Sequence, residues 1–357
     1  MKLDSLQTNT SVISSILNLD SHLVWRWYRD HLSGFRKSEL DGSHYQHDIH
    51  YIKGETVRVP IFKKENMGKQ MAIDEKQIGE DMHTIISNRE TGKIALLARS
   101  MSYQDIARLL DKDDPVCRRV EILTRDLSSL FAKVGNELLP NASHVADKFH
   151  IIRSLLDCCQ AVRVRLRQDV LREKRQKYEA HKKKEKNRKK ECLDNEIEYV
   201  RQSFKYEDGL LENGETVLEG LARSRYLLFK YPDDWTESQS RRALALFKKY
   251  PEIEKTYDRA CQFRKWMKKD NIGKPICLIK LELSEWIKDV ENDDIDEMLN
   301  FKSVIERNML PILNYFRFGV TNAMAESINS RIQRFIMINQ GTRVREFFYF
   351  RLANYFS

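Results

Sequence analysis

Short apolar runs broken by polar turns follow residue 69, and they predict the first strands of a sheet. The three runs span residues 69–78, 82–88 and 93–98. The breaks between them contain Gly79 and Gly92, which favour tight turns. Because connections this short join antiparallel neighbours, the pattern predicts an antiparallel meander.

Helical and strand-like patterns alternate along the next part of the chain. They predict a helix at 103–110, a strand at 120–124, a helix at 128–139 and a strand at 143–147. Three strands followed by helix, strand, helix and strand is the element order of a ribonuclease-H-like α/β fold. Ligands of open α/β sheets collect at the carboxyl ends of the central strands. We therefore expect a site where the apolar runs before Asp74 and Asp126 end.

After the fifth strand we expect a large basic and helical insertion into the core, over residues 156–312. From Arg163 to Lys190 the charge is almost all positive, and apolar residues nearly vanish after Val170. This stretch is either an exposed basic helix or a mobile arm. Helical spacing returns over residues 221–313. The tryptophans expected to pack in the core of the insertion are Trp235, Trp266 and Trp286.

The rest of the chain divides around this insertion. Residues 67–155 form the first part of the core, and residues 313–357 its C-terminal helical part. Residues 1–66 form a short leading region with two short helical pieces, at 14–19 and 22–28. The leading region also contains His44, His47 and His50. Because no cysteine or carboxylate there completes a tetrahedral set, a solvated linker is favoured over a metal site.

Composition narrows the class of partner. The 357 residues are 41% apolar, which is enough for a packed core, and carry a net charge of +9. That excess favours a polyanionic partner, although it also serves solubility. The six cysteines form no CxxC pair, which argues against a metal finger and for reduced thiols. No signal peptide or membrane span is evident, so we expect a soluble cytoplasmic protein without a membrane partner.

Three acidic residues far apart in sequence are the strongest candidates for chemistry. Asp74 and Asp126 each close an apolar run, and Glu326 lies at the start of a predicted helix. Hard divalent cations take oxygen ligands, and two ions about 3.5–4 Å apart hold both the attacking and the leaving oxygen of a phosphodiester. This arrangement favours phosphoryl transfer on DNA.

The helix predicted from residue 321 has two distinct faces. Its polar face carries Asn322, Glu326, Asn329 and Gln333. Its apolar face carries Met324, Ile328, Ile332 and Phe335. A carboxylate ligand flanked by amides suits a site where water or phosphate oxygens are oriented. The residues expected to contact DNA phosphates are Arg163, Arg165, Arg167, Lys182, Lys183, Lys184, Lys189, Lys190, Arg331 and Arg334.

A second cluster, Asp147 with His150, follows the fifth strand. Asp147 competes with Asp126 for the role of second metal ligand. We prefer Asp126, because its strand neighbours the first strand in a ribonuclease-H-like sheet. Asp147 and His150 would then hydrogen-bond to a ligand or to the scissile phosphate. A helix-capping role for Asp147 is the alternative.

Several of these segments carry a family resemblance. They are Ile73-Asp74-Glu75, Thr124-Arg125-Asp126, residues 146–150, residues 221–229, residues 321–329 and residues 347–352. Together they resemble the DDE transposases of bacterial insertion sequences. The ISL-three-type family is the nearest group, and the mutator-like transposases are more distant relatives. The resemblance covers roughly residues 65–357.

The resemblance implies a metal-dependent transposase with a ribonuclease-H-like fold. Asp74, Asp126 and Glu326 would hold two Mg²⁺ ions, which Mn²⁺ can replace, and Asp147, Asn322 and Asn329 would support them. One ion activates water to cut the transposon end, and the freed 3′-hydroxyl then attacks target DNA. The implied partners are double-stranded DNA, as transposon ends and target, and further copies of the chain on that DNA. The protein would associate with the nucleoid when bound.

One departure and two alternatives remain open. Many relatives begin with a cysteine zinc module and a helix-turn-helix, whereas residues 1–66 contain no cysteine and are too short for both. A separate polypeptide or the insertion would then recognise the transposon ends. A ribonuclease-H-like structure-selective nuclease is the nearest alternative function, because it would cut without joining. The other is a catalytically inactive, transposase-derived DNA-binding protein.

Overall fold

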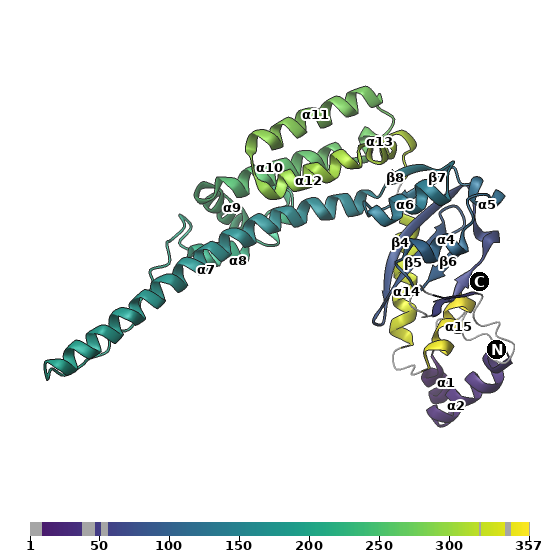
Figure 1. Ribbon diagram of the computed structural model, residues 1–357, viewed down its shortest axis with the longest axis horizontal. Coiled ribbons are helices and arrows are strands. Elements are labelled where there is room, and N and C mark those ends of the chain that lie inside the picture. The colour runs from purple at the N-terminus through teal and green to yellow at the C-terminus, as the bar shows by residue number, and fades with distance from the viewer. Residues whose placement is uncertain (1–8, 38–46, 51–55, 321–322, 340–343, 357) are drawn as a thin grey trace. The chain divides into compact units, whose positions relative to one another are not determined.

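The computed structural model describes residues 9–37, 47–50, 56–320, 323–339 and 344–356 (Figure 1). Internal contacts divide the chain into two units. The first comprises residues 1–151, 272–276 and 308–357. The second comprises residues 152–271 and 277–307.

A six-stranded mixed sheet forms the centre of the first unit, with the strand order β3-β6-β5-β4-β7-β8. Its strands are β3 (Ile61–Phe62), β4 (Gln70–Ile78), β5 (Asp81–Asn88), β6 (Ile94–Ala98), β7 (Ile122–Arg125) and β8 (Ser143–Ala146). The pairs β4–β5, β5–β6 and β3–β6 are antiparallel, whereas β4–β7 and β7–β8 are parallel. The predicted meander and the mixed α/β class are therefore confirmed. The sheet also begins at β3, before the boundary expected at residue 67.

Helices cover both faces of this sheet. On one face lie α4 (Tyr103–Leu109) and α6 (Ser129–Leu138), packed on inward side chains such as Ile73 and Leu123. A short helix, α5 (Pro115–Arg118), precedes β7. Successive side chains of a strand point to opposite faces. The residue after Ile73, Asp74, therefore belongs to the other face.

The C-terminal helices cover that other face. They are α14 (Ala323–Ile338) and α15 (Arg345–Tyr355). The buried residues Ile328, Ile332 and Phe335 of α14 pack with sheet residues such as Ile85, as the predicted apolar face requires. Met324 was assigned to that face, but its side chain is 36% exposed.

The N-terminal residues contain two helices, where two short helical pieces were predicted. Two helices, α1 (Thr10–Leu17) and α2 (Ser21–Trp27), are followed by a π-helical turn, η2 (Tyr28–Leu32). Phe35 and Tyr28 pack around Phe347 of α15. Strands β1 (His47–His50) and β2 (Thr56–Val59) form an antiparallel pair, so the linker prediction is wrong for His47 and His50. His44 lies outside the described residues.

The second unit is helical. Its helices are α7 (Lys148–Asp194), whose first turn belongs to the first unit, α8 (Val217–Arg223), α9 (Glu237–Lys249), α10 (Pro251–Trp266), α11 (Ile276–Asp293) and α12 (Asp296–Arg307). The three tryptophans pack inside this unit, and each indole N–H donates to a backbone carbonyl. The predicted core role is confirmed for Trp266 and Trp286, whereas Trp235 is half-buried and packs on Phe247 and Tyr257. The next helix, α13 (Met309–Phe318), returns to the first unit and lies along β8.

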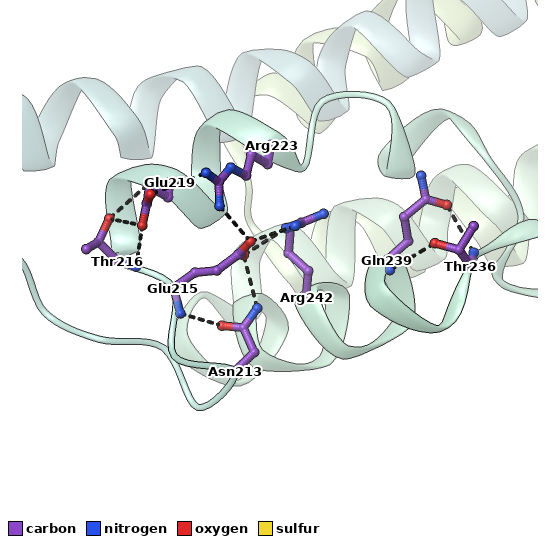
Figure 2. A network of polar contacts seen from close by, with 8 residues as sticks. All are labelled: Asn213, Glu215, Thr216, Glu219, Arg223, Thr236, Gln239 and Arg242. Atoms are coloured by element: carbon purple, nitrogen blue, oxygen red, sulfur yellow. Dashed lines mark hydrogen bonds and ion pairs between the residues drawn. The ribbon is translucent and has the colours of Figure 1, made fainter.

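Polar side chains fix the start of α8 and α9 (Figure 2). Thr216 with Glu219 and Thr236 with Gln239 form reciprocal capping boxes, which satisfy the free N–H groups of a helix start. Glu215 accepts hydrogen bonds from Arg242 of α9 at 2.6 and 2.7 Å. The hydrogen bonds from Arg242, with further ones from Asn213 and Arg223, lower the pKa of the Glu215 carboxyl to about 2.

Candidate active site

The register of the parallel strands brings three aspartates into one row. Ile73 of β4 pairs with Arg125 of β7, and Arg125 pairs with Ala146 of β8. The next residues along these strands are Asp74, Asp126 and Asp147. Because the three strands are adjacent and parallel, these residues line up where the parallel pairing ends.

This register corrects one expectation. Asp74 was expected at the carboxyl end of its strand, yet β4 continues to Ile78, as the run predicted over 69–78 does, and stays paired with β5. Only the parallel pairing with β7 stops at Ile73. Asp74 therefore lies in the middle of β4, beside the carboxyl end of β7.

Asp74 is held from two sides. The Asn329 amide of α14 donates to Asp74 Oδ2 at 2.6 Å, and the Glu75 backbone N–H donates to Oδ1 at 2.8 Å. The residue is only 7% exposed. Burial raises the pKa of the Asp74 carboxyl, and the charge of Asp147 adds to the rise. The two hydrogen bonds and His150 oppose it.

Asp126 has a related environment. Its Oδ1 accepts the backbone N–H of Ser128 at 2.8 Å, just before α6 begins. Burial raises the pKa of the Asp126 carboxyl, against the effects of Ser128, His150 and Arg125. Asp147 again adds to the rise. The same neighbours thus act on Asp74 and Asp126, which makes the row one electrostatic cluster.

Asp147 has the helix-capping role that was the alternative, and it also contacts His150. It is 3% exposed, and its Oδ1 accepts the backbone N–H of Phe149 at 2.9 Å, so it caps the first turn of α7. His150 Nε2 lies 3.7 Å from Asp147 Oδ2, which is an ion-pair distance rather than a hydrogen bond. The choice between Asp126 and Asp147 is therefore not exclusive, because both line the row.

Arg125 also belongs to this region, although no role was predicted for it from the sequence. It is 3% exposed. Its guanidinium donates to the Asp126 carbonyl at 2.7 Å and to His144 Nδ1 and Asn308 Oδ1 at 3.3 Å. Burial, together with Arg125, lowers the pKa of His144 to about 4, which keeps that imidazole a neutral acceptor. The sequence signal was an arginine inside an apolar run, directly before Asp126.

The third member of the predicted triad stands apart from the row. Glu326 is exposed in the first turn of α14. It precedes Asn329 by three residues, so helix geometry puts both on one side of α14, about one turn apart. Asn322 lies outside the described residues. Within the described ranges, no three His, Cys, Asp or Glu side chains are grouped closely enough to hold a metal ion.

The residues predicted to contact DNA fall into two groups. Arg163 is buried and donates to the Leu221 carbonyl at 2.7 Å, and Arg165 is paired with Glu297 and Glu252. Both arginines thus have partners within the second unit, and their contact with DNA stays a prediction. Arg167 is half-buried. The exposed residues are Lys182, Lys183, Lys184, Lys189 and Lys190.

On α14 the two predicted phosphate-binding arginines differ. The Arg331 guanidinium stacks over the rings of Tyr355 and Phe356, 5.3 and 4.8 Å from their centroids. Arg334 is exposed. Only Arg334 thus extends from the helix as predicted.

Comparison with known protein families gives a match that covers the whole row of aspartates. A family model described as a transposase matches residues 71–352, a range that contains the three aspartates, His150 and Glu326. No curated protein and no solved structure gives a match. In the part of the chain that the structure describes, no helix is long and apolar enough to cross a membrane.

Proposed function

We propose that this chain, which belongs to the ISL-three-type family of DDE transposases, cleaves DNA at transposon ends and joins those ends to target DNA. The observation that carries the proposal is the row of Asp74, Asp126 and Asp147, tied by Asn329 to the helix of Glu326. Carboxylates from a central strand, its parallel neighbour and a C-terminal helix supply oxygen ligands for phosphoryl transfer.

The strand order supports a ribonuclease-H-like core. β4 is central: on one side β5 runs antiparallel to β4 and β6 antiparallel to β5, and on the other side β7 and β8 run parallel to β4. This is the arrangement expected from the order of elements in the sequence. The additional edge strand, β3, pairs with β6 on the side away from Asp74. It therefore leaves the carboxyl ends of the parallel strands open.

The chemistry of the donor set fits Mg²⁺, because its side chains are carboxylates. Burial already raises the pKa values of Asp74 and Asp126, so a bound cation would relieve an existing electrostatic cost. Asp74, Asp126 and Glu326 would hold the ions, which requires Glu326 on α14 to move closer to the row than it lies in this structure. When bound, two such ions neutralise the charge that develops on the phosphate oxygens.

The remaining side chains orient this site. The Asn329 amide donates to Asp74 Oδ2 and so fixes the direction of the carboxylate. The Ser128 N–H does the same for Asp126. His150 lies beside Asp147 and is one-third exposed, which leaves its ring able to donate to a phosphate oxygen. Arg125 fixes the backbone of Asp126 through its carbonyl.

A cleavage and strand-transfer assay tests the proposal. The substrate is DNA that carries the flanking repeats of the parent locus, incubated with the full chain and Mg²⁺ or Mn²⁺. We expect metal-dependent nicks at the repeat ends and, with added plasmid, joined products. Cleavage without joining would favour the structure-selective nuclease. Binding without cleavage under any divalent metal would favour the inactive DNA-binding protein.

A further inference from the structure

The long helix α7 has one face occupied by its own chain. Residues 197–209, which carry no regular secondary structure, follow the turn at the end of α7 and run back along it. The Tyr178 and Phe204 rings meet edge to face at 5.3 Å. Lys174 Nζ lies 4.9 Å from the centroid of the Tyr206 ring. This side of α7 is therefore covered by its own chain.

Polar contacts extend the same covered side towards the end of the helix. Glu185 accepts from the Tyr199 hydroxyl at 2.8 Å and from the Gln202 N–H at 3.0 Å. The Arg188 guanidinium stacks over the Tyr199 ring and donates to a carbonyl of the returning segment. The covered positions of α7 are 174, 178, 181, 185 and 188, spaced three or four apart as one helical face requires.

The opposite side of α7 carries cations. At 3.6 residues per turn, the covered positions occupy a sector of about 80°, and a second sector of about 80° is centred roughly 140° away. We call the cations of this second sector the basic stripe. It comprises Arg172, Arg175, Lys183, Lys186 and Lys190, all of them exposed. Glu179 lies among them.

We propose that the basic stripe is a docking surface for the phosphate backbone of duplex DNA, bound without regard to base sequence. The stripe is about 27 Å long, from 18 residues at 1.5 Å each. Duplex DNA carries a negative charge for every ~1.7 Å of its axis, so this length faces many phosphates. Long cationic side chains suit phosphates, whereas the Asn and Gln side chains that read adenine are sparse along the stripe.

Two features favour DNA over other polyanions. A helix that lies on a membrane buries a free apolar face, but the face of α7 opposite the stripe is covered by residues 197–209. The choice of DNA rather than RNA rests on the proposed function. The stripe does not include every lysine predicted to contact DNA. Lys184 lies about 100° around the helix axis from the sector of the stripe, so it serves as a control position.

Two triple variants of equal charge change test this inference in the full chain. The stripe variant is K183Q/K186Q/K190Q, and the matched control is K184Q/R201Q/K205Q, which changes exposed cations of the helix and its returning segment. Affinity for a 30-base-pair duplex without terminal repeats is measured by fluorescence anisotropy against salt, with EDTA present. The readout is the slope of log affinity against log salt.

We expect the stripe variant to flatten the slope by about 2–3, close to 0.9 for each lost phosphate contact, and the control by less than about 1. Equal changes of slope in both variants would show a general effect of charge and overturn the proposal. An unchanged slope in both variants would also overturn it. Equal affinity of the unmodified chain for RNA duplexes or for anionic lipid vesicles would overturn the assignment to DNA.

Folding and catalysis are kept separate from this result. Melting temperatures of both variants are compared with that of the unmodified chain, and the single change K186Q replaces the triple variant where the triple variant melts early. Because binding is measured without divalent metal, a chain that proves unable to cleave still gives a valid slope. Failure of the stripe would likewise leave the cleavage assay unaffected.

Discussion

The Asn329 amide donates a 2.6 Å hydrogen bond to the Asp74 carboxylate, although 255 residues separate them in sequence. Asp74 is in the middle of a buried strand, and Asn329 is one turn after Glu326 on α14. The bond therefore joins Asp74 to the helix that carries Glu326. Burial raises the pKa of the Asp74 carboxyl, and the hydrogen bond from Asn329 opposes that rise because it stabilises the charged carboxylate.

The first prediction concerns this bond. Asn329→Ala removes the donor that orients Asp74, and losses of this kind cost ~10–100-fold in metal affinity or activity. We therefore expect DNA cleavage to slow by that factor and the Mg²⁺ concentration for half-maximal rate to rise. The matched control is Gln333→Ala, one turn further along the same face of α14 and exposed. Equal losses in both variants would contradict a specific role for Asn329.

The second prediction concerns the acidic residues. Asp74→Asn, Asp126→Asn and Glu326→Gln each remove a ligand charge and little volume, so each should abolish cleavage and leave DNA affinity nearly unchanged. Cleavage is followed on labelled repeat-end DNA, and affinity by gel shift in EDTA. Glu75→Gln, at an exposed position beside Asp74, is the control and should remain active.

The same assay decides between the two aspartates after the parallel strands. Asp147→Asn should slow cleavage without abolishing it, because its carboxylate already caps α7 and contacts His150. Full activity of Asp126→Asn, combined with an inactive Asp147→Asn, would show that the second ligand is Asp147.

Local patterns in the sequence predicted the elements well. The runs at 69–78, 82–88 and 93–98 match β4, β5 and β6 to within one residue at each end. Side-chain alternation and turn residues are local signals, so they can be read from the sequence without knowledge of the fold. The run at 69–78 already contains Asp74 in its interior, but the point where its pairing with β7 ends is not a local signal. The buried apolar residues before Asp74 end with the pairing to β7, whereas β4 itself continues because β5 still pairs with it.

Charged residues were harder to place for the same reason. Arg163 and Arg165 sit in a basic run, yet their partners lie 58 to 132 residues away in sequence, at Leu221, Glu252 and Glu297. Arg125 is buried against Asn308, 183 residues away. Composition gives the sign of the net charge of a segment, but only tertiary contacts decide which of its cationic side chains remain exposed.

The third prediction separates a catalytic His150 from a structural one. His150 is one-third exposed and contacts Asp147 at 3.7 Å, so its removal costs little packing. We expect His150→Ala to slow single-turnover cleavage by ~10–100-fold while the melting temperature stays close to that of the unmodified chain. A large fall in melting temperature with a proportionate loss of rate would assign His150 a structural role instead.

The last prediction concerns stability against pH and the core residue His83. Its Nε2 lies 2.7 Å from the Tyr349 hydroxyl, in a hydrogen bond that joins β5 to α15. Burial lowers the pKa of His83 from 6.5 to about 4. The unfolded chain therefore binds a proton at this residue between these pH values, and the folded chain does not. Stability from this group is complete above pH ~6.5 and is lost as pH falls towards 4.

The size of the effect is roughly 3 kcal/mol at most, from the difference between the two pKa values. Urea unfolding between pH 4 and 7 measures it. His83→Gln should flatten the rise of unfolding free energy across this window, whereas Tyr349→Phe should lower that energy by about 1 kcal/mol at every pH and keep the slope. His144, whose pKa is also about 4, supplies the slope that remains in His83→Gln. An unchanged slope in His83→Gln would show that His83 does not stay neutral in the folded core.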